Sequence, residues 1–167
     1  LAAARSGEVR EAAWNEIDQD QNLWVIPSSR MKAGKEHRVP LTGHMLDILK
    51  SLPRMKGTTL IFPAMRGEKM SDMTLSAVMR RMHETELGAG RAGWLDPRIG
   101  RTAVPHGLRS TFRDWVAERT SYDRDMAEIA LAHTVGSAVE RAYRRGDMLE
   151  KRRAMMEAWA SFVTTPT

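Results

Sequence analysis

Residues 105–115, PHGLRSTFRDW, contain the pattern on which the interpretation of this 167-residue chain depends. Proline lacks a backbone N–H, and the N–H groups of a first helical turn have no partner within the helix, so Pro105 predicts a helix start. His106 and Arg109 then share one face of the opening turns, where free N–H groups and the helix dipole favour an anion. A guanidinium that binds two phosphate oxygens and an imidazole that transfers a proton make this turn a candidate phosphoryl site. The alternative is a His and an Arg on a solvated helix face.

The composition indicates one globular domain and a polyanionic partner. The chain is 42% hydrophobic, which is enough for one core. It has no apolar run near the eighteen or so residues of a membrane span and no export-like start, so we expect a soluble, intracellular protein. The absence of cysteine excludes disulfides and thiolate zinc ligands. Lys and Arg exceed Asp and Glu by 26 to 21, and this positive charge favours a polyanionic partner such as nucleic acid. Because the chain begins at Leu1 within a helical pattern, we expect a fragment of a longer protein.

The first half of the chain alternates helical and β-prone patterns. Residues 1–13 have apolar residues at helical spacing, which predicts a helix with Arg5 inside it. Two β-prone runs, 23–26 and 37–39, flank a polar turn and predict a hairpin with Lys32 near its tip. Further elements are a helix after Thr42 that ends at Pro53, an extended segment in TTLIFP, and a helix capped by Ser71 or Asp72. In that last helix the apolar residues recur at helical spacing, at Leu75, Val78, Met79 and Met82, and the methionines are expected in the core.

Helices dominate the second half after a long loop. Residues 88–103 contain glycines, Pro97 and scattered arginines, which is typical of an irregular loop. The fold class predicted from these patterns is α+β and mostly α-helical, with a small antiparallel hairpin at one edge. The predicted later helices are 105–119, 124–132, 136–144 and 147–163, and the tryptophans expected in the core are Trp14, Trp24, Trp115 and Trp159.

Six positions together resemble the active site of the tyrosine recombinases, the phage-integrase family. AARSGEV resembles the family's first arginine box, RMKAGKEHRVPL its lysine hairpin, HGLR its His-x-x-Arg box, and LAHTVGSAVERAYRR its second histidine and nucleophilic tyrosine. The boxes follow the family's order, cover essentially the whole chain, and most resemble integrases of prophages and genomic islands. The six positions are Arg5, Lys32, His106, Arg109, His133 and Tyr143.

The resemblance implies a role for each position. Tyr143 attacks a DNA phosphodiester and forms a 3′-phosphotyrosyl bond, which allows rejoining without ATP. Arg5 and Arg109 hold the non-bridging oxygens and offset the charge that builds on phosphorus. His106 accepts or donates a proton near the tyrosine, while His133 bonds the phosphate or orients its neighbours. Because cations perform this chemistry, the resemblance implies no metal or cofactor.

Lys32 is the expected acid for the departing 5′ oxygen. Its reference pKa is too high for an acid at neutral pH unless nearby positive charge lowers it. The spacing in MKAG favours Lys32 over Lys35, although a general basic patch of Arg30, Lys35 and Arg38 that neutralises DNA phosphates is an alternative. Glu8 either buttresses Arg5 or is a plain surface carboxylate.

The remaining chemistry-bearing residues have less context in the sequence. His37, His44 and His83 are assigned to surface or hairpin positions, and Tyr122 is assigned to packing. Trp94 lies in the arginine-containing loop and either contacts DNA or packs in the loop.

The resemblance also implies the setting of the chain. Residues 1–167 would be an integrase catalytic domain whose parent protein has an N-terminal DNA-clamping domain. Its partners would be double-stranded DNA attachment sites and other copies in a tetramer on DNA, with the isolated domain monomeric and no membrane involved. It would act in the bacterial cytoplasm, at the nucleoid when on DNA, to integrate or excise a mobile element. A type IB topoisomerase and a non-catalytic DNA-binding relative are the alternative functions.

Overall fold

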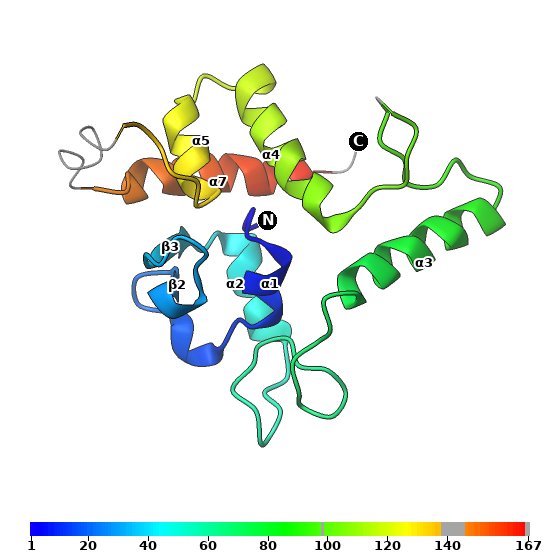
Figure 1. The fold of residues 1–167 in the computed structure, drawn as a ribbon, viewed down its shortest axis with the longest axis horizontal. Helices are drawn as coiled ribbons and strands as arrows, with labels where there is room; N and C mark the ends of the chain where they lie inside the picture. The colour runs from blue at the N-terminus through cyan, green and yellow to red at the C-terminus, as the bar shows by residue number, and fades with distance from the viewer. Residues whose placement is uncertain (98, 138–145, 166–167) are drawn as a thin grey trace.

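The computed structural model describes residues 1–97, 99–137 and 146–165. Helices α4, α5 and α7 gather on one side of the molecule, and the strands with α1 and α2 lie on the other (Figure 1). The elements are α1 (Ser6–Arg10), η1 (Trp14–Glu16), β1 (Ile17–Asp18), β2 (Leu23–Ile26), η2 (Ser28–Arg30), β3 (His37–Pro40), α2 (Gly43–Ser51), α3 (Thr74–Gly88), α4 (Pro105–Arg119), α5 (Arg124–Ala130) and α7 (Leu149–Thr164). This mostly helical architecture with one small antiparallel sheet confirms the predicted fold class.

The sheet is antiparallel in the order β1, β2, β3. In the β2–β3 pair, Leu23 lies opposite Pro40 and Ile26 opposite His37, as the predicted hairpin requires. The Thr42 hydroxyl accepts a hydrogen bond from the Met45 N–H at 3.4 Å and so caps α2. The sheet, α2 and adjoining segments enclose a hydrophobic cluster that includes Ala12, Trp24, Ile26, Val39, Leu41, Met45 and Ile61.

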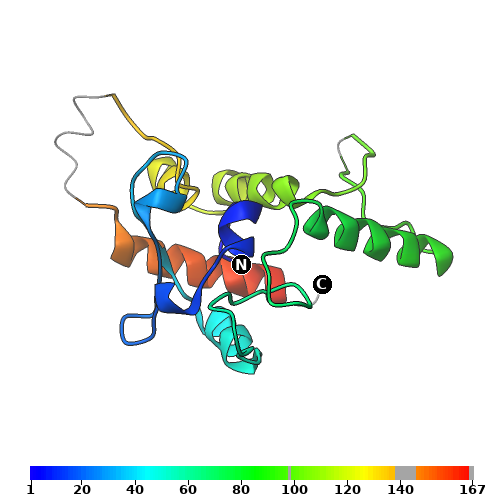
Figure 2. The same cartoon turned by 60° about the horizontal axis from the view of Figure 1, so that its bottom comes forward.

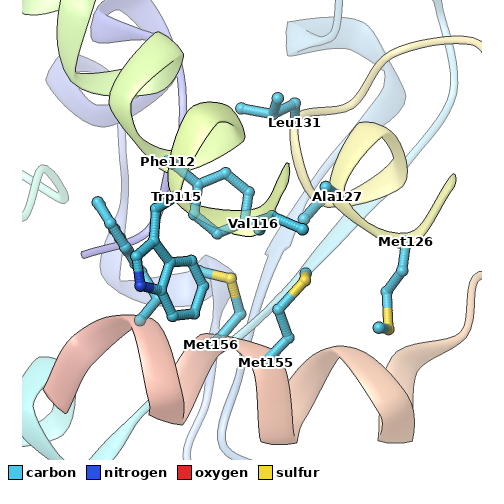
Figure 3. Packing of buried hydrophobic residues seen from close by; sticks show 10 residues of the cluster. Phe112, Trp115, Val116, Met126, Ala127, Leu131, Met155 and Met156 are labelled. Carbon is cyan, nitrogen blue, oxygen red and sulfur yellow. The ribbon is translucent and has the colours of Figure 1, made fainter. Parts of the chain in front are cut away.

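A second hydrophobic cluster joins α4, α5 and α7. Figure 3 shows Phe112 and Trp115 of α4 facing Met155 and Met156 of α7. The ring of Trp159 meets Phe112 edge-on, with centroids 5.4 Å apart. The last helix therefore packs on its own domain, and its buried methionines and tryptophan supply much of this core. The cluster comprises Phe112, Trp115, Val116, Met126, Ala127, Ala130, Leu131, Met155, Met156 and Trp159.

The helix predicted over residues 1–13 is much shorter in the structure, where α1 spans Ser6–Arg10. Arg5 is its N-cap rather than an interior residue, with φ −72° and ψ 150°. Ala3 has a φ of 50°, outside the helical region. The Glu8 carboxylate accepts from the Arg5 backbone N–H at 2.7 Å, and the Ala3 carbonyl accepts from Arg109. These contacts hold the first residues outside a helix.

Helix α3 extends away from both clusters (Figure 2). All of α3 lies within the described residues, and none of them is buried. The expected burial of Met79 and Met82 is therefore wrong, because the helix projects past the cores that these side chains would fill. Neither Ser71 nor Asp72 caps it, since the N-cap is Met73, without a side-chain cap. The helix predicted over 136–144 falls almost entirely outside the described residues.

Candidate active site

Arg109 is a buried arginine in the second turn of α4, with 6% of its surface exposed. Its Nη2 donates to the Leu131 carbonyl at 2.6 Å, and its Nη1 donates to the Ala3 carbonyl. Burial and the neighbouring charge of Arg5 lower the pKa of Arg109. A guanidinium stays protonated throughout the accessible pH range, so this site contains a permanent, poorly solvated positive charge.

Arg5 approaches the same backbone from α1. Its Nη2 donates to the Ala132 carbonyl at 3.3 Å, one residue beyond the carbonyl that Arg109 binds. Its Nη1 donates to Glu8 at 2.8 Å, and Glu8 is itself buried. Glu8 is thus a buried buttress of Arg5 rather than a surface carboxylate. The two arginines, 104 positions apart in sequence, converge on the end of α5.

His133 lies next to these arginines because of how α5 ends. The Ala132 N–H donates to the Ile129 carbonyl and the His133 N–H to the Glu128 carbonyl, both at 2.9 Å. Ala132 has a φ of 52°, so the helix ends in a Schellman motif with a left-handed residue. This turn brings His133 Nε2 to 3.4 Å from Arg109 Nη2.

The His133 ring is oriented by Glu128, a residue that the sequence analysis did not single out. The Nδ1 atom donates to Glu128 Oε2 at 2.6 Å, and Arg113 Nε donates to the other carboxylate oxygen at 2.7 Å. Burial alone would raise the pKa of Glu128, but the hydrogen bonds from His133 and Arg113 outweigh it and lower the pKa. With the Nδ1 proton donated to a carboxylate, the lone pair of Nε2 faces Arg109 as an acceptor.

Of the other three predicted residues, two are exposed and the third lies outside the described residues. His106 is exposed in the first turn of α4, three residues before Arg109. Lys32 is exposed in the turn between η2 and β3. Tyr143 lies outside the described residues. The structure therefore brings Arg5, Arg109 and His133 together, with His106 one helical turn from Arg109.

A cleft of about 430 Å³ opens beside this cluster. Within the described residues its lining includes His133 but neither arginine, and Lys35 but not Lys32. Arg5 nevertheless reaches the edge of the cleft, because it binds the carbonyl of the lining residue Ala132. The lining residues are Met31, Ala33, Lys35, Glu36, His37, Arg38, Ile129, Ala132, His133, Thr134, Val135, Gly146 and Asp147. The described part of the chain shows no group of three or more His, Asp or Glu side chains that could hold a metal ion.

The family model described as the phage integrase family matches residues 2–150, which is most of the chain. The chain belongs to the phage integrase family. This membership confirms the resemblance found in the sequence. The relatives of this integrase-family chain include prophage integrase IntA of Escherichia coli K12, which is 38% identical over 98% of this chain and 36% of its own length. The integrase of Enterobacteria phage P4 is 29% identical over 98% of this chain and 38% of its own length. The chain thus spans little more than a third of these relatives.

Solved recombinase structures share the fold. XerA recombinase superposes with a TM-score of 0.58 at 17% identity, over 99% of this chain and 55% of that one. The lambda integrase dimer bound to a COC′ core site superposes with a TM-score of 0.53 at 21% identity, over 88% of this chain and 49% of that one. No helix in the described ranges has the length and apolar character needed to cross a membrane.

His37 is the other residue that the sequence analysis underestimated. It lies on the hairpin as expected, but it is buried in β3 rather than at the surface. The sequence signal is its position within the alternating run HRVP, where the first and third residues share one face of the strand.

Proposed function

We propose that this chain is the catalytic domain of a site-specific DNA recombinase that integrates or excises a mobile element in bacteria. It would be part of a longer protein with an N-terminal DNA-clamping domain. Its substrate would be double-stranded DNA at attachment sites, cut and rejoined within a tetramer of the protein, in the cytoplasm and at the nucleoid. The lambda integrase structure, a dimer bound to a core site, supports DNA as the partner.

The proposed reaction is a transesterification at phosphorus. The phenol oxygen of Tyr143 attacks the scissile phosphate, the bond to the 5′ oxygen breaks, and a 3′-phosphotyrosyl bond forms. His106 accepts the phenol proton, and Lys32 gives a proton to the departing 5′ oxygen. Attack by a free 5′ hydroxyl reverses these transfers and reseals the strand. One phosphoester replaces another at each step, so no external energy source is needed.

The convergence of Arg5, Arg109 and His133 carries this proposal. Two guanidinium groups within electrostatic reach of each other repel, and Glu8 offsets only part of their charge. A bound phosphate would relieve that repulsion, and more so as negative charge builds on its non-bridging oxygens during attack. Donors fixed in place before the substrate arrives need no reorganisation during the reaction. In this site the backbone carbonyls of Ala3, Leu131 and Ala132 hold the guanidinium groups in place.

The test uses a nicked suicide DNA substrate, which traps the covalent intermediate because the short 5′ fragment diffuses away. The full-length protein should form an adduct that survives a denaturing gel, and Tyr143→Phe should form none. Tyr122→Phe is the matched control, because Tyr122 is the only other tyrosine in the sequence. Its hydroxyl donates to the Ala154 carbonyl at 3.3 Å and is not part of the site.

An adduct that forms equally with Tyr143→Phe would overturn the assignment of the nucleophile. Strand exchange between two duplexes separates a recombinase from a topoisomerase, because a type IB topoisomerase acts on one duplex. Adduct formation and relaxation of a supercoiled plasmid, without any exchange between two attachment-site duplexes, would favour the topoisomerase.

A further inference from the structure

Asp147 lies where three parts of the molecule meet. Its Oδ1 accepts from Arg38 Nη2 at 2.7 Å, and its Oδ2 accepts from Arg38 Nε at 3.1 Å. The same Oδ2 accepts from Arg152 Nη2 at 2.8 Å. Arg38 belongs to β3 and Arg152 to α7, so one carboxylate joins the hairpin strand to the last helix.

Arg152 completes the connection through the backbone. Its Nε donates to the Asp147 carbonyl and its Nη1 to the Arg38 carbonyl, both at 2.8 Å. Only 1% of Arg152 is exposed. Burial would raise the pKa of Asp147, but the hydrogen bond from Arg38 and the charges of both arginines outweigh it and lower the pKa. The carboxylate therefore stays ionised at neutral pH, and the contacts are charge-assisted hydrogen bonds.

This cluster restrains the chain that follows the proposed nucleophile. Tyr143 precedes Asp147 by four residues. The cluster therefore holds the chain only four residues after the proposed nucleophile. Val135, Gly146 and Asp147 all line the same cleft as His133. Residues on both sides of Tyr143 in the sequence thus line this cleft.

We propose that the Arg38–Asp147–Arg152 cluster is a positioning device that fixes the C-terminal end of the tyrosine-bearing segment against the hairpin carrying Lys32. This inference rests on the proposed function and deepens it. The nucleophile and the acid belong to segments that the cluster ties together. Attack in line with the leaving oxygen depends steeply on position, and a misplacement of about 1 Å can cost about a hundredfold in rate.

Arg38→Met is the informative variant. The Arg38 side chain is 41% exposed, so its loss removes the link to β3 while Asp147 keeps its contacts with Arg152. Replacement of Asp147 would instead leave the buried Arg152 without its counter-charge. Arg153→Met is the matched control on α7. Arg153 also joins α7 to the sheet region, but its contacts there are with the Gln21 and Asn22 carbonyls and not with Asp147.

Three measurements on the full-length proteins test the proposal. At saturating nicked substrate, Arg38→Met should form the covalent adduct at least about tenfold more slowly than Arg153→Met. The two variants should bind the intact site with affinities within about twofold of each other. Amide hydrogen exchange of residues 146–149 without DNA should be about tenfold faster in Arg38→Met than in Arg153→Met. Arg38→Lys, which retains one ion pair, should recover part of the adduct rate.

The outcomes separate this proposal from the proposed function. Equal adduct rates and equal exchange in the two variants would overturn the positioning role. A loss of DNA affinity by Arg38→Met, with a smaller salt dependence of binding and unchanged exchange, would also overturn it and make Arg38 a phosphate ligand. If the wild-type protein forms no adduct, the proposed function fails. In that case the exchange of residues 146–149 still decides whether the cluster anchors this segment.

Discussion

His37 couples the hairpin to the helices through a buried imidazole. It has 9% of its surface exposed in β3. Burial, followed by the positive charge of Arg152, lowers its pKa from 6.5 to about 4. The charges of Glu8 and Asp147 and a hydrogen bond with the Ala130 backbone act in the opposite direction and do not compensate. The ring is therefore neutral in the folded protein at neutral pH.

This lowered pKa predicts a pH dependence of stability. Between pH 6.5 and about 4 the unfolded chain binds a proton that folded His37 does not, so the free energy of unfolding falls as the pH falls through this range. From about pH 7 to about pH 5 the contribution of His37 amounts to about 2 kcal/mol. Urea unfolding at both pH values should show this loss in the wild type and a smaller one in His37→Gln.

His44→Gln is the control for this prediction, because His44 is exposed at the start of α2. Its variant should retain the pH dependence of the wild type. If His37→Gln and His44→Gln lose equal stability between the two pH values, the titration of His37 is not the cause. The comparison uses the difference between two pH values, so any constant cost of replacing His37 cancels.

Among the elements, those with a local signal were predicted best. Pro105 fixed the start of α4, and Thr42 that of α2, because a missing N–H and a hydroxyl cap act within one turn of the chain. The elements predicted poorly depend on distant partners. Residues 1–5 leave the helical conformation because Glu8 caps Arg5 and because Arg109 binds the Ala3 carbonyl. Spacing within the first thirteen residues contains no information about Arg109.

Helix α3 is the clearest case in which an amphipathic pattern does not lead to burial, and it gives a prediction about methionines. Met82 is 51% exposed on α3, whereas Met155 of α7 is 0% exposed within the second cluster. Met82→Ala should change the free energy of unfolding by less than about 0.5 kcal/mol, because few contacts are lost. Met155→Ala should lower it by about 2–5 kcal/mol, because a cavity replaces close-packed atoms.

Chemical denaturation of the two methionine variants provides the measurement. Both remove the same atoms, so intrinsic differences between Met and Ala affect them alike. A cost above about 1.5 kcal/mol for Met82→Ala would mean that α3 buries this face in solution.

At the scale of the whole molecule, the candidate site lies between the two hydrophobic clusters, and arginines make the connections across it. Arg5 reaches from α1 to the Ala132 carbonyl, and Arg109 reaches from α4 to the Ala3 carbonyl. The sequence indicated which residues could serve a phosphate, because their types and order match a family. It could not indicate the carbonyls that hold them, or that Glu128 orients His133, because those partners come together only in the folded chain.

Arg152 makes a third connection between the two sides, and its removal tests whether they unfold together. Arg152→Met would leave the Arg38 and Asp147 carbonyls without these donors and would remove one counter-charge of Asp147. Asp147 is 30% exposed and keeps Arg38, so the main cost comes from the two carbonyls. A buried acceptor left without its donor costs about 1–3 kcal/mol, so the free energy of unfolding should fall by about 2–5 kcal/mol. Arg153→Met, whose partners are surface carbonyls and an exposed carboxylate, should cost less than about 1 kcal/mol.

Urea unfolding followed by tryptophan fluorescence reports both sides, because Trp24 lies in one cluster and Trp115 and Trp159 in the other. If Arg152 links the clusters, the urea concentration at the midpoint of unfolding should be lower in the variant than in the wild type. Separate unfolding of the two clusters would appear as two transitions. A loss no larger than that of Arg153→Met would show that the buried guanidinium does not hold the clusters together.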